Sequence, residues 1–267
     1  MKHNYVEMIR DANVYDVARK TPLDFANLLS QRLNNQIWLK REDMQSVFSY
    51  KIRGAYNLMS SLTAAELAAG VVAASAGNHA QGVALSARKL RTKAIIVMPK
   101  TTPSIKIDAV FRLGGEVVLH GNSYDDASEY AKSLASERTL TFIPPYDHPL
   151  VIAGQGTVGL EILEQANSEI DAIFVPVGGG GLVSGIGAYI KEVSPTIKLI
   201  GVEPAEAASM TAALDSGKRV SLEEIGIFAD GAAVRQVGKE NFLLAQRHVD
   251  EMLTVTIDEI CAAVKDI

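Results

Sequence analysis

The chain has 267 residues, enough to bury a sizeable core and to form one large domain or two lobes. Apolar residues make up 48% and charged residues 21%, which is typical of a globular protein and argues against intrinsic disorder. The net charge of −5, without any long basic run, disfavours nucleic acid and anionic membrane surfaces, so a small molecule is the expected partner.

The cysteine content and the N-terminal sequence indicate the cellular compartment in which the protein is expected. Cys261 is the only cysteine, which excludes an internal disulfide and a CxxC metal or redox site and fits a reducing compartment. The N-terminus lacks an apolar signal core, and no run of the sequence is long enough to span a bilayer. The sequence therefore predicts a cytoplasmic protein without a membrane segment.

Short apolar runs typical of buried strands alternate with helical patterns along the whole chain. The runs lie at residues 37–39, 71–74, 94–98, 116–120, 141–143, 173–177 and 198–202. Ser123 is a predicted N-cap, and Ala127, Ala131 and Leu134 follow it at helical spacing. This alternation predicts an α/β fold with mostly parallel sheets flanked by helices.

The distribution of these runs predicts two lobes. Four of them lie between residues 70 and 146, enough for a small sheet of their own. Residues 1–69 and 147–267 would form the larger lobe. The proline-rich stretch 144–149 is the predicted crossing point, because proline stiffens the chain and cannot donate ladder hydrogen bonds.

The first candidate for chemistry is Lys51, in the stretch 48–56. Aromatic and small residues surround it, and Gly54 follows closely. A partly desolvated amine loses its proton near neutral pH and can then form a Schiff base with a carbonyl compound. Most lysines are solvated surface charges, so this signal gains weight only from the two motifs that follow.

The second motif, residues 75–79, follows the predicted strand 71–74 and precedes a helical pattern. Its hydroxyl, amide and backbone N–H donors suit a carboxylate and a phenolic oxygen. His79 could act as an acid or base, but a histidine in the first turn of a helix is more often packed or hydrogen-bonded. A cofactor contact by Asn78 is the favoured interpretation.

The third motif is a run of four glycines at 178–181, between the predicted strand 173–177 and a helix that opens at Leu182. Such a loop can hold a phosphate with backbone N–H groups, although glycines also serve tight packing alone. The spacing fits neither a Walker loop nor a dinucleotide fingerprint. A lysine, a donor-rich loop and a phosphate loop together suit pyridoxal 5′-phosphate.

With these motifs in place, the chain resembles the biosynthetic threonine deaminases (threonine ammonia-lyases) of the tryptophan-synthase-β-like, fold type II pyridoxal-phosphate family. The resemblance rests on residues 19–23, 40–43, 51–56, 74–82, 145–149, 152–157, 175–182 and 261–266. It implies a two-lobed fold in which Lys51 carries the cofactor and Asn78 contacts its ring oxygen. The implied phosphate cradle is Gly178, Gly179, Gly180, Gly181 and Leu182, and the implied substrate-binding loop is Ser75, Ala76, Gly77, Asn78 and His79.

The resemblance also implies an activity. It is β-elimination of L-threonine to 2-oxobutanoate and ammonia, and of L-serine to pyruvate, in isoleucine biosynthesis, by a homo-oligomer (dimer or tetramer). The amine of Lys51 would remove the Cα proton. Serine racemases of this family have a second serine where this chain has Ala76, so negligible racemase activity is expected.

Three departures from the family pattern matter. Tyr50 replaces a common phenylalanine. Glu203, Ala207 and Ser209 match the spacing of a cation site in the racemase-like branch, but a serine replaces its last carboxylate, so no metal is expected. The chain ends at Ile267, so the larger lobe is expected to be incomplete, without a C-terminal regulatory domain, and cofactor binding or turnover to be weakened.

Other interpretations of the sequence stay open. The chain could be another fold type II enzyme acting on serine or O-acetylserine, or a non-catalytic fragment of such an enzyme. A nicotinamide-dependent dehydrogenase is disfavoured, because the glycine spacing is wrong and no acidic residue stands in the ribose-binding role.

Overall fold

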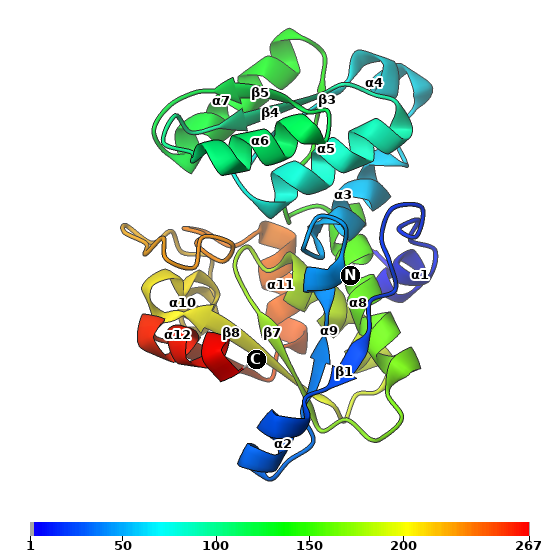
Figure 1. Cartoon of the computed structure of the whole chain (residues 1–267), viewed down its shortest axis with the longest axis vertical. Helices are drawn as coiled ribbons and strands as arrows, with labels where there is room; N and C mark the ends of the chain where they lie inside the picture. The colour runs from blue at the N-terminus through cyan, green and yellow to red at the C-terminus, as the bar shows by residue number, and fades with distance from the viewer. Residues whose placement is uncertain (1–2, 267) are drawn as a thin grey trace. The chain divides into compact units, whose positions relative to one another are not determined.

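The computed structural model describes residues 3–266 and divides into two compact units, many of whose elements are labelled in Figure 1. The first unit comprises residues 3–10, 20–42 and 156–266, and the second comprises residues 11–19 and 43–155. Helix α8 (Pro149–Gln165) contributes residues up to Gln155 to the second unit and residues from Gly156 onward to the first.

The second unit is built on a four-stranded parallel sheet with the order β5-β4-β3-β6. The strands are β3 (Val71–Ala74), β4 (Ala94–Met98), β5 (Glu116–Leu119) and β6 (Thr141–Phe142). Its helices are α3 (Lys51–Met59), α4 (Ala64–Ala69), α5 (Asn78–Leu90), α6 (Ser104–Arg112) and α7 (Tyr124–Glu137). A 3₁₀ turn, η1 (Glu42–Met44), lies at the chain boundary between the units.

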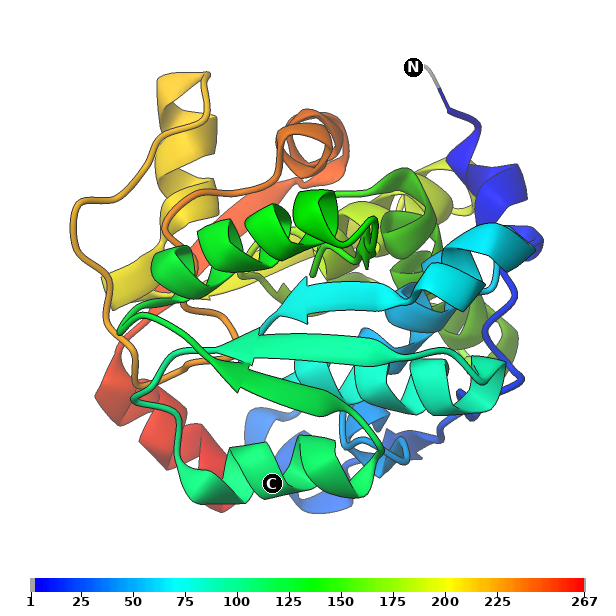
Figure 2. The ribbon, with the colours of Figure 1, turned by 90° about the horizontal axis from the view of Figure 1, so that it is seen from above.

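Alternate side chains of β3 and β4 enter two different cores. Val71, Ala73 and Ile96 pack with residues of α3, α5 and α6 on one face. Val72 and Ile95 pack against α7 on the other face. Figure 2 shows α5 and α6 on one side of the strands and α7 on the opposite side. Both faces of the sheet are covered, which explains why its central strands are continuously apolar.

The first unit contains a three-stranded parallel sheet with the order β7-β8-β9 and a separate antiparallel pair, β1-β2. The strands are β1 (Leu23–Phe25), β2 (Trp38–Lys40), β7 (Ala172–Pro176), β8 (Lys198–Pro204) and β9 (Glu251–Val255). The helices are α1 (Tyr5–Arg10), α2 (Asn27–Leu33), α9 (Gly181–Val193), η2 (Ala205–Ala207), α10 (Ser209–Ser216), α11 (Lys239–His248) and α12 (Ile257–Asp266).

Most predicted elements are confirmed, and the differences have physical causes. All seven predicted strands correspond to strands, and Ser123 caps α7 in a reciprocal capping box with Asp126. The run at 37–39 overlaps β2, which pairs antiparallel with β1 rather than entering a parallel sheet. Strand β9 was not predicted, because its side chains are largely exposed and it therefore lacks a buried-strand pattern.

The compact units differ from the predicted lobes at their boundaries. Residues 43–69 group with the second unit, although the sequence assigned them to the larger lobe. The reason is the packing of α3: Ala55, Leu58 and Met59 belong to the same core as Ala80 and Val83 of α5. Membership of a core is a tertiary property, so composition alone does not reveal it.

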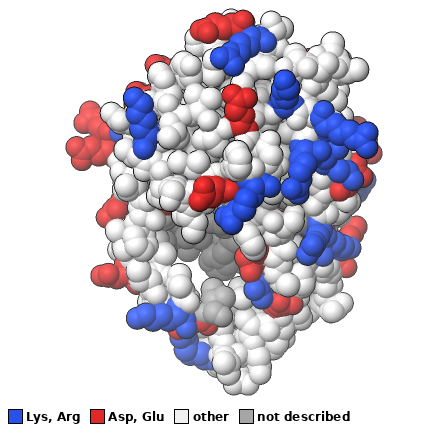
Figure 3. Space-filling model, turned by 45° about the horizontal axis from the view of Figure 1, so that its top comes forward, with Lys and Arg blue, Asp and Glu red and all other residues white. Residues whose placement is uncertain are grey.

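Two surface properties bear on function. Within residues 3–266, every helix is too short or too polar to cross a lipid bilayer. On the face drawn in Figure 3, Lys and Arg side chains are interspersed with Asp and Glu and with uncharged residues.

Candidate active site

Lys51 is the first residue of α3 and lies in the second unit. Its Nζ donates a hydrogen bond to the carbonyl oxygen of Pro145 at 2.9 Å and lies 5.7 Å from the ring centroid of Tyr50. Burial lowers the pKa of Lys51 to about 8. With that pKa, roughly a quarter of the amines are neutral at pH 7.5. The side chain is thus a cationic group that readily becomes a nucleophile.

Two glycines let neighbouring helices approach α3 closely. A Cβ on Gly54 would lie 2.7 Å from the carbonyl oxygen of Val151, and one on Gly82 would lie 3.3 Å from the backbone of Lys51. Gly54 therefore packs directly against α8, while Gly82 packs α5 onto the start of α3. These close contacts restrict where the Lys51 backbone can lie. The sequence drew attention to Gly54 by its proximity to Lys51, but gave no sign of this packing role.

Tyr50 precedes Lys51 and departs from the family pattern. It keeps its phenolic proton. Burial raises the pKa of Tyr50 to about 12, so its phenol stays neutral near the lysine. Tyr50 is also the N-cap residue of α3, and its side chain makes no capping hydrogen bond.

The predicted substrate loop runs from the end of β3 to the start of α5. Ser75, Ala76 and Gly77 are half-buried and Asn78 is exposed. The backbone N–H of Gly77 donates to Ser75 Oγ at 3.2 Å. Gly77 is the N-cap of α5 and has no side chain with which to satisfy the first-turn N–H groups. An uncapped helix N-terminus of this kind can bind a carboxylate.

His79 is buried in the second unit, with 4% of its surface exposed. Its Nε2 lies 2.9 Å from the carbonyl oxygen of Ile143, and because a carbonyl can only accept, Nε2 carries the proton. Burial first, and then the charge of Lys51, lower the pKa of His79 to about 3. A neutral, hydrogen-bonded imidazole with so low a pKa is a poor acid–base catalyst. The geometry therefore supports the packed interpretation of His79.

The four glycines lie in the first unit, between β7 and α9. Gly180 is the N-cap of α9 with φ 93°, a left-handed conformation that favours glycine, and Gly181 begins the helix. A Cβ on Gly180 would lie 2.7 Å from Met210 Cε, and one on Gly178 would lie 3.0 Å from Ala232 Cα. The carbonyl oxygen of Gly179 accepts a hydrogen bond from Asn241 Nδ2 at 2.9 Å.

These contacts bear on both interpretations of the glycine run. Tight packing is observed at Gly178 and Gly180. The start of α9 also lacks a side-chain cap, so its first-turn N–H groups suit an anion. Asn241, which holds Gly179 from α11, was missed by sequence reasoning, and no local pattern around it indicates this role.

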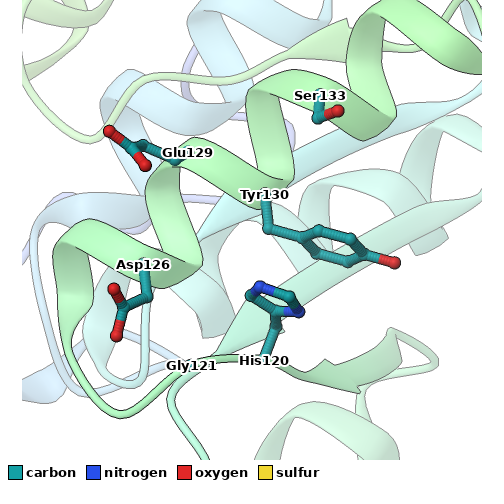
Figure 4. Close-up of a pocket in the computed structure, with 6 residues that line it drawn as sticks. All are labelled: His120, Gly121, Asp126, Glu129, Tyr130 and Ser133. Atoms are coloured by element: carbon teal, nitrogen blue, oxygen red, sulfur yellow. The ribbon is translucent and has the colours of Figure 1, made fainter.

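A separate pocket of about 480 Å³ lies at the carboxyl end of β5 in the second unit (Figure 4). The imidazole of His120 stacks on the ring of Tyr130 with 3.9 Å between centroids. Asp126 accepts hydrogen bonds from the N–H groups of Asn122 and Ser123, so its carboxylate completes the capping box that Ser123 forms at the start of α7. None of the predicted site residues lines this pocket. Among residues 3–266, no cluster of three or more His, Cys, Asp or Glu side chains could hold a metal ion.

Comparison with known proteins identifies the family. The model of the family described as pyridoxal-phosphate dependent enzyme matches residues 14–267. Threonine dehydratase biosynthetic, chloroplastic, of Arabidopsis thaliana is 58% identical over 262 residues, which cover 98% of this chain and 44% of the plant protein. L-threonine dehydratase biosynthetic IlvA of Pasteurella multocida is 54% identical over 263 residues, covering 98% of this chain and 51% of that protein. The chain thus spans about half the length of these curated relatives.

A solved structure shows the same relationship in three dimensions. The processed form of threonine deaminase isoform 2 from Solanum lycopersicum is 52% identical, with a TM-score of 0.96 over 98% of this chain and 76% of the tomato chain. This match confirms the predicted α/β fold class with parallel sheets and the predicted cofactor class. The chain belongs to the pyridoxal-phosphate-dependent enzyme family, and its sequence places it among the threonine deaminases of that family.

Proposed function

We propose that this chain carries out the dehydration and deamination of L-threonine to 2-oxobutanoate and ammonia, and of L-serine to pyruvate, in isoleucine biosynthesis. The names of the Arabidopsis and Pasteurella relatives, which are biosynthetic threonine dehydratases, support this activity. The observation that carries the proposal is the half-buried amine of Lys51, which donates a hydrogen bond to the carbonyl oxygen of Pro145 and whose pKa is lowered to about 8.

The residues present fit pyridoxal 5′-phosphate. Lys51 offers an amine that is deprotonated at little cost, and Asn78 is exposed at the start of α5 for a contact with the ring oxygen. The proposed phosphate cradle is Gly178, Gly179, Gly180, Gly181 and Leu182, where α9 begins without a side-chain cap. When bound, the cofactor supplies an electron sink for the pair of electrons left at Cα after proton removal.

Lys51 is the proposed base for the Cα proton. Its lowered pKa keeps part of the population neutral near pH 7.5, and a base works best when its pKa lies near the operating pH. The carbonyl oxygen of Pro145 orients the amine, since it accepts a hydrogen bond from Nζ. The same amine is the proposed attachment point of the cofactor.

The loop of Ser75, Ala76, Gly77, Asn78 and His79 is the proposed substrate site. The substrate carboxylate would accept hydrogen bonds from the open first turn of α5. His79 positions this turn, because its ring is hydrogen-bonded to the carbonyl oxygen of Ile143. Ala76 offers no hydroxyl for a second base, so elimination is expected to exceed racemisation by a wide margin.

The test is to load the protein with pyridoxal 5′-phosphate, reduce it with borohydride and map the labelled peptide. The label is expected on Lys51, and Lys51→Ala is expected to lose about 100- to 10,000-fold in 2-oxobutanoate formation, the range for a general base. Lys20→Ala is the control, because Lys20 forms an exposed ion pair with Glu164. A label on another lysine, or none at saturating cofactor, contradicts the proposal.

Product analysis separates the alternative functions. Threonine and serine should give keto acids, whereas cysteine formed from O-acetylserine and sulfide would indicate a β-replacing enzyme. D-serine formed at a rate comparable to pyruvate would contradict the elimination assignment. A colourless protein whose absorption spectrum does not change when pyridoxal 5′-phosphate is added would indicate a non-catalytic fragment.

Assembly and location complete the proposal. We infer a homo-oligomer, a dimer or a tetramer, located in the cytoplasm. Large apolar side chains on the first unit, among them Leu28 at 79% exposed, offer surface for association. Light scattering coupled to gel filtration would measure the mass, and a monomer at micromolar concentration would contradict this part of the proposal.

A further inference from the structure

Glu203, near the end of β8, is a fully buried carboxylate that accepts hydrogen bonds from one turn of helix α10. Its Oε1 accepts a hydrogen bond from the backbone N–H of Met210 at 2.8 Å. Its Oε2 accepts from the backbone N–H and from Oγ1 of Thr211, both at 2.8 Å. Burial raises the pKa of Glu203, while these three hydrogen bonds oppose the rise.

Glu203 thereby performs the task of an N-cap for α10. The N-cap position is Ala208, whose side chain cannot accept a hydrogen bond. Met210 and Thr211 are the second and third residues of the helix, whose N–H groups a capping side chain normally satisfies. The capping carboxylate comes instead from strand β8, and its hydrogen bonds hold the N-terminus of α10 against the sheet.

Helix α10 is in turn packed against the glycine loop. Met210 has no exposed surface, and its Cε would lie 2.7 Å from a Cβ on Gly180. Gly180 holds a left-handed conformation at the N-cap of α9. The methyl end of Met210 therefore lies against Gly180, on the side where a side chain at that position would point.

We propose that Glu203 is a positioning residue for the glycine loop: by capping α10 it holds Met210 against Gly180 and keeps the loop shaped for a phosphate group. The role rests on the proposed function, because it assumes that this loop receives the cofactor phosphate. The spacing of Glu203, Ala207 and Ser209 matches that of a cation site in the racemase-like branch. The observed partners of Glu203 are N–H and O–H donors, which fit an anion acting as a helix cap.

The experiment compares the affinities of the protein for pyridoxal 5′-phosphate and for pyridoxal, which lacks the phosphate. Glu203→Gln keeps the shape, but its amide nitrogen cannot accept a hydrogen bond from the backbone N–H that it faces. We expect this variant to bind pyridoxal 5′-phosphate at least tenfold more weakly and pyridoxal with little change. Glu224→Gln, an exposed acid in the same unit, is the charge-matched control and should leave both affinities unchanged.

A second variant, Met210→Ala, leaves every hydrogen-bonding group of the cap in place and removes only the side chain that contacts Gly180. It should reproduce the selective loss of affinity for the phosphorylated compound, even if Glu203→Gln does not fold. A purely structural role would lower both affinities together, or lower only the melting temperature, and would overturn the inference. Stabilisation of the parent by Mg²⁺ or Ca²⁺ that disappears in Glu203→Gln would also overturn it.

The two proposals fail in different ways. If the unmodified protein binds no pyridoxal 5′-phosphate, the proposed function fails. If it binds the cofactor and both variants keep the full preference for the phosphorylated compound, only the role of Glu203 fails.

Discussion

At the scale of single residues, burial determines which groups are reactive. Lys51 and His79 both carry depressed pKa values, and burial is the first cause of each shift. The consequences differ, because a lysine with a pKa near 8 becomes a usable nucleophile, whereas a histidine with a pKa near 3 becomes inert at neutral pH. The motifs around Lys51 and His79 indicated functional positions. The pKa values depend on the surroundings that the fold builds.

The lowered pKa of Lys51 predicts a pH-dependent stability of the cofactor-free protein. The folded state binds the Lys51 proton more weakly than the unfolded state, where the pKa is near its ordinary value of 10.5. The free energy of unfolding contributed by Lys51 therefore rises from pH 8 to pH 10.5 and is flat below pH 8. The variant Lys51→Met lacks this rise, and at pH 7 it should be more stable than the parent protein by up to about 3 kcal/mol.

Urea denaturation of both proteins without cofactor, between pH 6.5 and pH 10.5, would measure this effect. The difference in free energy of unfolding between Lys51→Met and the parent should shrink as the pH rises above 8. A constant difference across this range would show that Lys51 is solvated in the folded protein.

At the scale of elements, the glycine loop shows how one segment can pack tightly against its neighbours and also leave N–H groups for an anion. Gly180 needs its positive φ and its lack of a side chain, because Met210 and Asn241 pack against it. The same conformation begins α9 without a side-chain cap and leaves N–H groups for an anion. The two interpretations of the glycine run are therefore compatible.

Gly180→Ala and Gly217→Ala separate packing from backbone strain. Both glycines have positive φ, but only Gly180 has neighbours within 4 Å of the added Cβ. Gly217→Ala should cost about 1–2 kcal/mol, the cost of a left-handed alanine. Gly180→Ala should cost more than that, by about 1–3 kcal/mol of overpacking. Equal losses of unfolding free energy in urea would contradict the close contacts of Gly180 with Met210 and Asn241.

At the scale of the whole molecule, buried polar contacts join segments that are distant in the chain. In the first unit, Lys40 Nζ contacts Glu161 Oε2 at 2.5 Å, the carbonyl oxygen of Thr21 at 2.6 Å and Gln165 Oε1 at 2.8 Å. The side chains of Lys40 and Glu161 are 8% and 0% exposed. These contacts connect β2 and the segment before β1 with α8.

Removing one partner of this ion pair should therefore be costly. Lys40→Met takes the cation away from a buried carboxylate and should lower the free energy of unfolding by about 3–5 kcal/mol. Lys40→Met combined with Glu161→Leu should recover much of the loss, because no charge then stays buried at the pair. The exposed pair of Lys20 and Glu164 is the control, and Lys20→Met should cost under about 1 kcal/mol. Equal effects of the two lysine variants would show that the buried pair is solvated.

The sequence by itself determined the α/β class, the parallel strands and the family. Their signals are local: continuous apolar runs such as 71–74, a capping serine at position 123, and motifs around Lys51 and the glycine run. The cofactor class followed from those motifs. Each of these depends on residues that are neighbours in the chain, so each can be read from the sequence.

Only the tertiary structure decided which segments share a core and which polar groups meet. The packing of α3 with α5 and the salt bridge between Lys40 and Glu161 join residues far apart in sequence, and the cap that Glu203 provides joins a strand to the helix that follows it. The pKa of Lys51 belongs to the same class, because it is set by burial. Burial and long-range hydrogen bonds are properties of the folded chain, and a local pattern does not contain them.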